Sequence, residues 1–64
     1  MKMTDDEVAL GAAMMLLRRH GDLAPQRVAQ RIGELALAGD HEGIELWKQI
    51  ASRMDQILRP GAAH

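Results

Sequence analysis

The stretch VALGAAMMLL, Val8 to Leu17, places nine apolar residues and one glycine in ten positions of a chain of 64 residues. A helix on the surface of a small domain needs one apolar stripe, which faces the core. Because successive helical residues turn by about 100°, this stretch spreads apolar side chains around most of a helix. The fold must therefore cover the segment on more than one side.

Signals at both ends delimit the helix that contains this stretch. Thr4 and Glu7 have the spacing of a capping box, in which each side chain bonds the backbone amide of the other residue. The cationic residues 18–20 suit the negative end of the helix dipole, and Gly21 suits a left-handed C-cap. We therefore expect a first helix over residues 5–20.

A second helix is expected over residues 25–38, after a short loop at 21–24. Pro25 falls in its first turn, where proline is tolerated. Two N-caps are open, because Asp22 is the better capping side chain whereas Ala24 would make Pro25 the first helical residue. Apolar residues recur here with helical spacing and polar residues occupy the opposite side, which predicts an ordinary amphipathic helix.

A third helix is expected over residues 41–58. Asp40 supplies its N-cap, and Pro60 with Gly61 ends it. Since little more than Gly39 and Asp40 joins the second helix to the third, the two must form a tight antiparallel hairpin. The first helix then packs across this hairpin.

The composition also predicts an all-α fold of three helices. The chain lacks Tyr and Phe and contains five Met, and residues that favour helices outnumber those that favour strands. Its length allows one domain over residues 1–64, of which residues 1–3 and 60–64 are expected to be flexible. A chain of this size buries only about 60% of its unfolded surface, so oligomerisation is one way to supplement its core.

Projected as a helix, the opening stretch has two apolar sides. One side, with Val8, Ala12, Met15 and Leu16, is expected to pack on the hairpin. The other side needs a second surface, which a two-fold dimer provides because the same patch serves as its own partner. The alternative is a central first helix whose outer apolar residues are simply tolerated. With the single tryptophan as a core or interface anchor, the predicted interface comprises Leu10, Ala13, Met14, Leu17 and Trp47.

The sequence contains few side chains that could act in catalysis or bind a metal. A chain without cysteine has no thiolate for zinc or for nucleophilic attack, and hydroxyl residues are scarce. His41 and Glu45 stand four residues apart on one helix, but His20 and His64 do not converge on them. We therefore expect no catalytic residue, no metal site and no cofactor, and we interpret the protein as a non-enzyme.

The formal net charge of −1 gives the chain no general attraction for nucleic acid or anionic lipid. No run approaches the roughly 20 apolar residues that span a bilayer, so a cytoplasmic protein without membrane contact is expected. A local basic cluster has two interpretations, a solvated helix face or a patch for an anionic partner. Its members are Arg18, Arg19, Arg27 and Arg31.

Two short stretches resemble known motifs. APQRVAQRIG, Ala24 to Gly33, is similar to the first helix of a helix-turn-helix DNA-binding motif, but no basic recognition helix follows it. GDHEGIELWKQIA, Gly39 to Ala51, resembles the turn and second helix of a tetratricopeptide repeat, but only one copy is present. Neither motif is complete enough to imply its usual function.

Residues distributed over most of the chain carry a third resemblance. They are His20, Gly21, Ala24, Pro25, Arg31, Ile32, Gly39, Asp40, Gly43, Trp47, Ile50 and Arg53. In this pattern the chain is similar to short bacterial proteins classed as a domain of unknown function. The resemblance implies a helical fold and supplies no activity.

These observations lead to one hypothesis and one alternative. We expect a small non-enzymatic homodimer of unknown cellular role that acts by binding another protein. The alternative is a small DNA-binding regulator that uses the basic cluster defined above. No residue in the sequence identifies a substrate or a particular partner.

Overall fold

A computed structural model describes residues 2–61 of the chain. The elements are α1 (Asp5–His20), the 3₁₀ turn η1 (Gly21–Leu23), α2 (Ala24–Ala38) and α3 (His41–Leu58). All of these elements are helical, and the all-α class is therefore confirmed. Residues 1 and 62–64, part of the termini expected to be flexible, lie outside the described residues.

The expectation of three separate helices is wrong. Residues 21–23, expected to form a loop, continue the helical path as η1, and Ala24 already belongs to α2. Within residues 2–61 the chain thus forms two uninterrupted helical segments, a bent one over 5–38 and α3. The corner stays hydrogen-bonded, because the Gly21 N–H donates to the Leu17 carbonyl and the Ala24 N–H donates to the Gly21 carbonyl.

The start of α2 uses neither of the two N-caps considered from the sequence. Leu23 occupies the capping position and no side chain caps there, while Pro25 lies in the first turn as expected. A side-chain cap is unnecessary at this point because η1 leads directly into α2. Gly21 makes the bend possible, since its φ of 56° and ψ of −130° favour glycine.

The other helix ends follow the local signals in the sequence. The capping box of α1 is confirmed: the Glu7 amide donates to Thr4 Oγ1 at 3.1 Å, and the Thr4 amide donates to Glu7 Oε1 at 3.4 Å. Gly39 adopts the left-handed conformation with φ of 72°, and Asp40 accepts a hydrogen bond of 2.9 Å from the Gly43 amide. These two residues turn the chain from α2 into α3.

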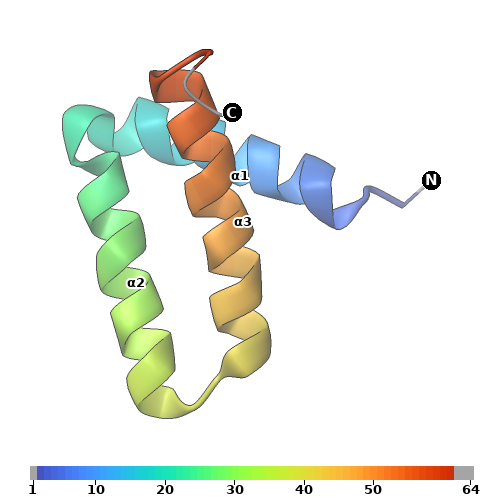
Figure 1. Ribbon diagram of the computed structural model, residues 1–64, viewed down its shortest axis with the longest axis vertical. Helices are drawn as coiled ribbons and strands as arrows, with labels where there is room; N and C mark the ends of the chain where they lie inside the picture. Colours follow the sequence, from blue (N-terminus) through green and yellow to red (C-terminus); the bar gives the residue numbers. More distant parts are fainter. Residues whose placement is uncertain (1, 62–64) are drawn as a thin grey trace.

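Figure 1 shows α2 and α3 side by side and antiparallel, with α1 crossing one face of the pair at a steep angle. The crossing lies toward the end of the hairpin that is away from the α2–α3 turn. α1 packs mainly on α3 and only slightly on α2. Its N-terminal turns extend past α3, so much of their surface faces away from the rest of the chain.

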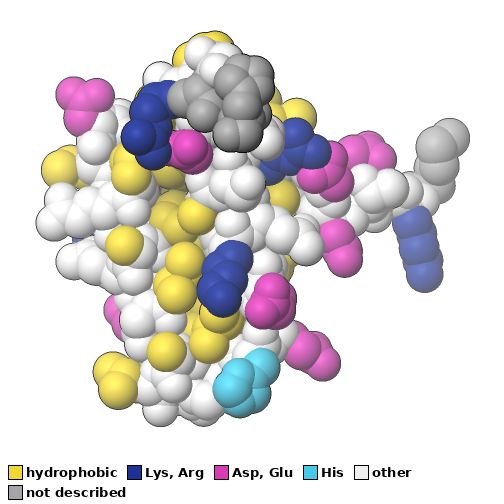
Figure 2. Space-filling model, in the orientation of Figure 1, with side chains coloured by type: hydrophobic (Ala, Val, Ile, Leu, Met, Phe, Trp, Pro, Cys, Tyr) yellow, Lys and Arg dark blue, Asp and Glu magenta, His cyan; other side chains and the backbone are white. Residues whose placement is uncertain are grey.

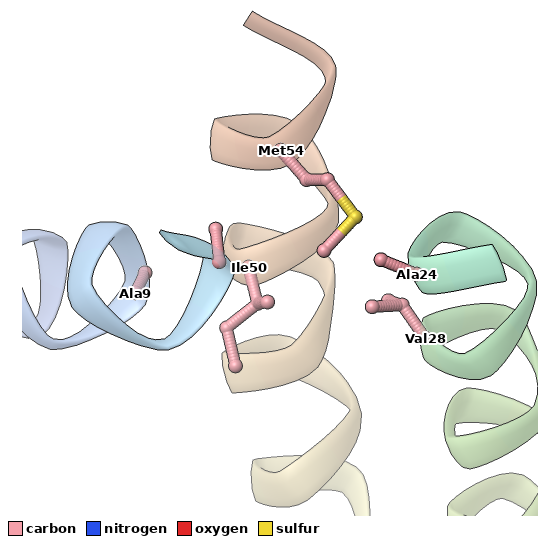
Figure 3. Packing of buried hydrophobic residues seen from close by; sticks show 6 residues of the cluster. Ala9, Ala24, Val28, Ile50 and Met54 are labelled. Atoms are coloured by element: carbon pink, nitrogen blue, oxygen red, sulfur yellow. The ribbon is translucent and has the colours of Figure 1, made fainter. Parts of the chain in front are cut away.

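The core is small and rich in alanine. Figure 3 shows Met54 of α3 directed toward Ala24 and Val28 of α2, while Ala9 of α1 approaches α3 from the opposite side. Small side chains let helices approach closely, and the larger groups then fill the space between them. The buried cluster comprises Ala9, Ala13, Ala24, Val28, Ile50 and Met54.

The core-facing side of α1 agrees with the expected one only in part, since Ala12 and Leu16 pack against the core cluster as expected. Val8 and Met15, expected against the hairpin, are 41% and 49% exposed, whereas Ala9 and Ala13 are fully buried. α1 crosses α3 on its alanine side because that side permits the closest approach. Leu16 and Leu17 also pack against the core, while the other large apolar side chains of the stretch are exposed, namely Val8, Leu10, Met14 and Met15.

A charged pair holds the projecting end of α1 against α3. Arg53 Nε donates to Asp6 Oδ1 at 2.8 Å, and Arg53 Nη2 donates to Asp6 Oδ2. These hydrogen bonds hold the pKa of Asp6 below its ordinary value and raise the pKa of Arg53. The pair joins residues 47 positions apart and fixes the direction of α1 beyond the alanine contact.

The core predicts a sharp contrast between two apolar substitutions. Met54 is 2% exposed, so Met54→Ala should lower the free energy of unfolding by about 2–5 kcal/mol, through lost burial and a cavity. Leu37 is 93% exposed, so the control Leu37→Ala should change it by no more than about 0.5 kcal/mol. Urea denaturation measures both, and equal effects would contradict the observed core.

The Asp6–Arg53 pair predicts a pH dependence of stability. Because the pKa of Asp6 is lower in the folded chain, its stabilisation is complete above the unfolded value of about 3.9 and is lost as pH falls through the folded value. NMR titration of the Asp6 carboxyl carbon should show a midpoint that rises in Arg53→Gln. The same midpoint in both proteins would show that the pair does not form in solution.

Candidate functional site

Exposed apolar side chains are the most unusual feature of the described surface. Among residues 2–61, four large apolar side chains are buried, namely Val28, Leu35, Ile50 and Met54, whereas ten are exposed. Single exposed apolar residues are normal, so only a cluster of them indicates a binding surface. The exposed ten are Met3, Val8, Leu10, Met14, Met15, Leu23, Leu37, Leu46, Ile57 and Leu58.

One such cluster lies on the flank of α1 and includes three of the predicted interface residues. Leu10 is 40% exposed and Met14 is 51% exposed, while Leu17 is half-buried and also packs on the core. Their spacing of four and three residues places them on one side of the helix. Met14 and Leu17 line a shallow depression together with Arg18. We call the side formed by Leu10, Met14 and Leu17 the outer flank.

The other two predicted interface residues do not lie on the outer flank. Ala13 is fully buried in the core cluster and offers no surface to a second molecule. Trp47 lies on α3, half-buried and packed against the same cluster, rather than on the outer flank. The structure therefore brings Leu10, Met14 and Leu17 together and places Ala13 and Trp47 in intramolecular contacts.

Two apolar surfaces were not predicted as sites from the sequence. Val8 and Met15 form the second exposed flank of α1. A hollow of about 90 Å³ between α2 and α3 is lined by Pro25, Val28, Ala51, Met54, Asp55 and Leu58. Figure 2 shows hydrophobic side chains along this groove, on the hairpin face away from α1. The hollow is smaller than typical ligand pockets, which hold about 300–1,000 Å³.

Charged groups stand at both ends of the outer flank. Glu7 bonds the amide and hydroxyl of Thr4, and Arg18 borders the depression beside Met14. In the described part of the chain, neither Glu7 nor Arg18 takes part in an ion pair. The pairs formed there are Arg31–Glu34, Arg53–Asp6 and Arg59–Asp55.

Three arginines of the predicted basic cluster have different surroundings in the structure. Arg31 Nη1 lies 3.1 Å from Glu34 Oε1, so its charge is already paired. Arg27 borders a hollow with Leu23, Gln26 and Gln30, whereas Arg18 borders the one on α1. None of the four hollows described in this section is lined by more than one of the four arginines, Arg18, Arg19, Arg27 and Arg31.

An open hollow of about 480 Å³ is lined by Asp5 at the start of α1 and by residues of the first half of α3. Asp5, His41, Glu42 and Glu45 contribute to its lining together with Leu46 and Gln49. Among residues 2–61, however, no group of three or more histidine or acidic side chains is placed to hold a metal ion. The hollow is wide open to solvent, so it provides no enclosed site for chemistry.

The length and apolar character of the helices can be compared with what a membrane-spanning helix needs. None of the helices within residues 2–61 combines the length and the apolar character needed to cross a bilayer.

Comparison with known protein families relates the chain to one of them. Residues 5–60 match DUF6961, described as a family of unknown function, and this range includes all of α1, η1, α2 and α3. The predicted resemblance to a domain of unknown function is thereby confirmed. No curated protein and no solved structure matches the chain. With its whole helical unit matched, the chain belongs to DUF6961, a family of unknown function.

Proposed function

We propose that this protein is a non-enzymatic interaction module that works as a homodimer, with the outer flank of α1 as the shared interface. The observation that carries the proposal is the exposure of Leu10 and Met14 on the same side of a helix whose opposite side is buried. α1 thus has one apolar surface satisfied within the chain and a second one that is not. A second copy is the partner always present at the same concentration.

The energetics favour covering this flank. Full burial of a leucine or methionine side chain stabilises by roughly 1.5–3 kcal/mol, and small domains are stable by only about 5–15 kcal/mol in total. In a two-fold dimer each interface residue is buried twice, once on each copy. Partial burial of Leu10 and Met14 would therefore contribute a significant fraction of the free energy of unfolding. Only four large apolar side chains are buried among residues 2–61 of a single chain.

The non-enzymatic part of the proposal rests on the chemistry of the surface. The chain has no cysteine, and the Thr4 hydroxyl is engaged in the capping box of α1. The larger hollows of the described surface are open rather than enclosed. Enzyme sites instead combine a concave pocket with several convergent polar groups.

A protein partner is the second part of the proposal. Dimerisation through the outer flank would leave two apolar surfaces of residues 2–61 outside the dimer interface, Val8 with Met15 on the opposite flank of α1 and the groove between α2 and α3. Both are apolar surfaces bordered by charged residues, which is the usual character of a protein-binding site. The dimer would present each of these surfaces twice.

Light scattering after gel filtration tests the proposal directly. At tens of micromolar, the protein should have twice the chain mass of 7.1 kDa. Leu10→Glu combined with Met14→Glu should give the mass of one chain, because four buried carboxylates per dimer would be desolvated without partners. A helical circular dichroism spectrum would show that the variant remains folded.

Leu37→Glu is the matched control, since it introduces the same charge on α2 at a residue that is 93% exposed. It should leave the mass at two chains. A single-chain mass for the unaltered protein, or a dimer that survives the double substitution on α1, would refute the proposal.

A further inference from the structure

We propose that the two copies pair through antiparallel α1 helices, so that Glu7 of each copy meets Arg18 of the other and each Met14 packs over the other copy's Gly11. This inference rests on the proposed homodimer and specifies its geometry. The occupant of the outer flank is thus the outer flank of a second chain.

One side of α1 carries a regular pattern of residues that suits pairing with a second copy. Glu7, Gly11, Met14 and Arg18 are separated by four, three and four residues, which places them on one side of α1. Leu10 and Leu17 adjoin this line on the same outer flank. The buried residues Ala9 and Ala13 point toward α3, so this face is directed away from the core.

The charges at the two ends of α1 favour an antiparallel arrangement. α1 has acidic residues in its first turn and basic residues in its last, at positions 5–7 and 18–20. Within residues 2–61, Asp6 is paired with Arg53, whereas Glu7 and Arg18 belong to no ion pair. A parallel arrangement would bring like charges together at both ends. An antiparallel arrangement brings opposite charges together at both ends and also aligns the helix dipoles favourably.

A single two-fold axis satisfies both kinds of contact. Glu7 and Arg18 lie at equal distances on either side of the midpoint between Ala12 and Ala13, and so do Gly11 and Met14. A two-fold axis through this midpoint therefore creates two Glu7–Arg18 pairs and two Gly11–Met14 contacts. The same axis places Leu10 at a level between Met14 and Leu17 of the other copy. The Leu10 side chain could therefore pack between these two side chains.

Gly11 is otherwise unexplained in the middle of a helix. Glycine is among the least favourable residues at such positions, and a Cβ added at Gly11 would meet nothing within 4 Å in the single chain. The fold of one chain therefore does not require glycine there. A methionine of a second chain that packs directly over Gly11 would require glycine there, because any larger residue at this position would hold the two helices apart.

Charge exchange tests the orientation. Glu7→Lys and Arg18→Glu should each raise the dimer dissociation constant, measured by sedimentation equilibrium in low salt, by roughly tenfold. The protein that carries both substitutions should return to within about threefold of the original value, because each pair then forms with its charges exchanged. The doubly substituted protein still lacks the hydrogen bonds of Glu7 in the capping box. A change in capping therefore cannot explain a recovery of dimer affinity.

A doubly substituted protein that binds no better than the weaker single variant would overturn the antiparallel geometry. That result would leave the homodimer itself intact, because the Leu10→Glu and Met14→Glu protein tests self-association independently. Conversely, a single-chain mass for the unaltered protein would remove both proposals.

Replacing the glycine tests the close contact. Gly11→Ala should weaken the dimer by about threefold or more, although it favours the helix within each chain. Gly33→Ala is the matched control, because Gly33 is also exposed within a helix and an added Cβ meets nothing within 4 Å. It should leave the dissociation constant unchanged. The same constant for Gly11→Ala and for the unaltered protein would contradict contact at Gly11.

Discussion

The close contact between the alanine side of α1 and the face of α3 determines the rest of the structure. Ala9 and Ala13 allow α1 to lie directly against the cluster that contains Ile50 and Met54. Leu16 and Leu17 complete this contact, whereas Val8, Leu10, Met14 and Met15 fall on the flanks of α1. The hairpin of α2 and α3 covers only one side of α1, and the outer flank with Leu10 and Met14 remains exposed. The small core and the large apolar surface therefore have the same cause.

Local signals predict the helix ends well, because capping depends on neighbouring residues. The Thr4–Glu7 box and the Gly39–Asp40 turn form as their spacing indicates. Two other features were not fully predicted: the corner at residues 21–24 was predicted wrongly, and the core-facing side of α1 was predicted only for Ala12 and Leu16. The corner at Gly21 keeps its backbone hydrogen bonds through η1 and so is not a loop. The core-facing side of α1 could not be found from periodicity, because a helix that is apolar almost all round offers no unique stripe.

The candidate site was predictable only in part for the same reason. Leu10 and Met14 are exposed, but the surplus of apolar residues could not distinguish them from Ala13, which the contact with α3 buries completely. Trp47 is half-buried against the core, although a tryptophan suits an interface equally well. The Asp6–Arg53 pair, which fixes the projecting end of α1, joins positions too far apart in sequence for any local pattern to reveal.

The central claim is that a second copy of the chain covers the outer flank of α1. Isotope-filtered NMR on a mixture of labelled and unlabelled protein tests it most directly, because it detects only contacts between chains. The account predicts intermolecular nuclear Overhauser effects from the Met14 methyl group to Leu10 and Gly11 of the other copy. The claim would be contradicted if intermolecular effects came only from Val8, Met15 or the groove between α2 and α3, or if none were observed.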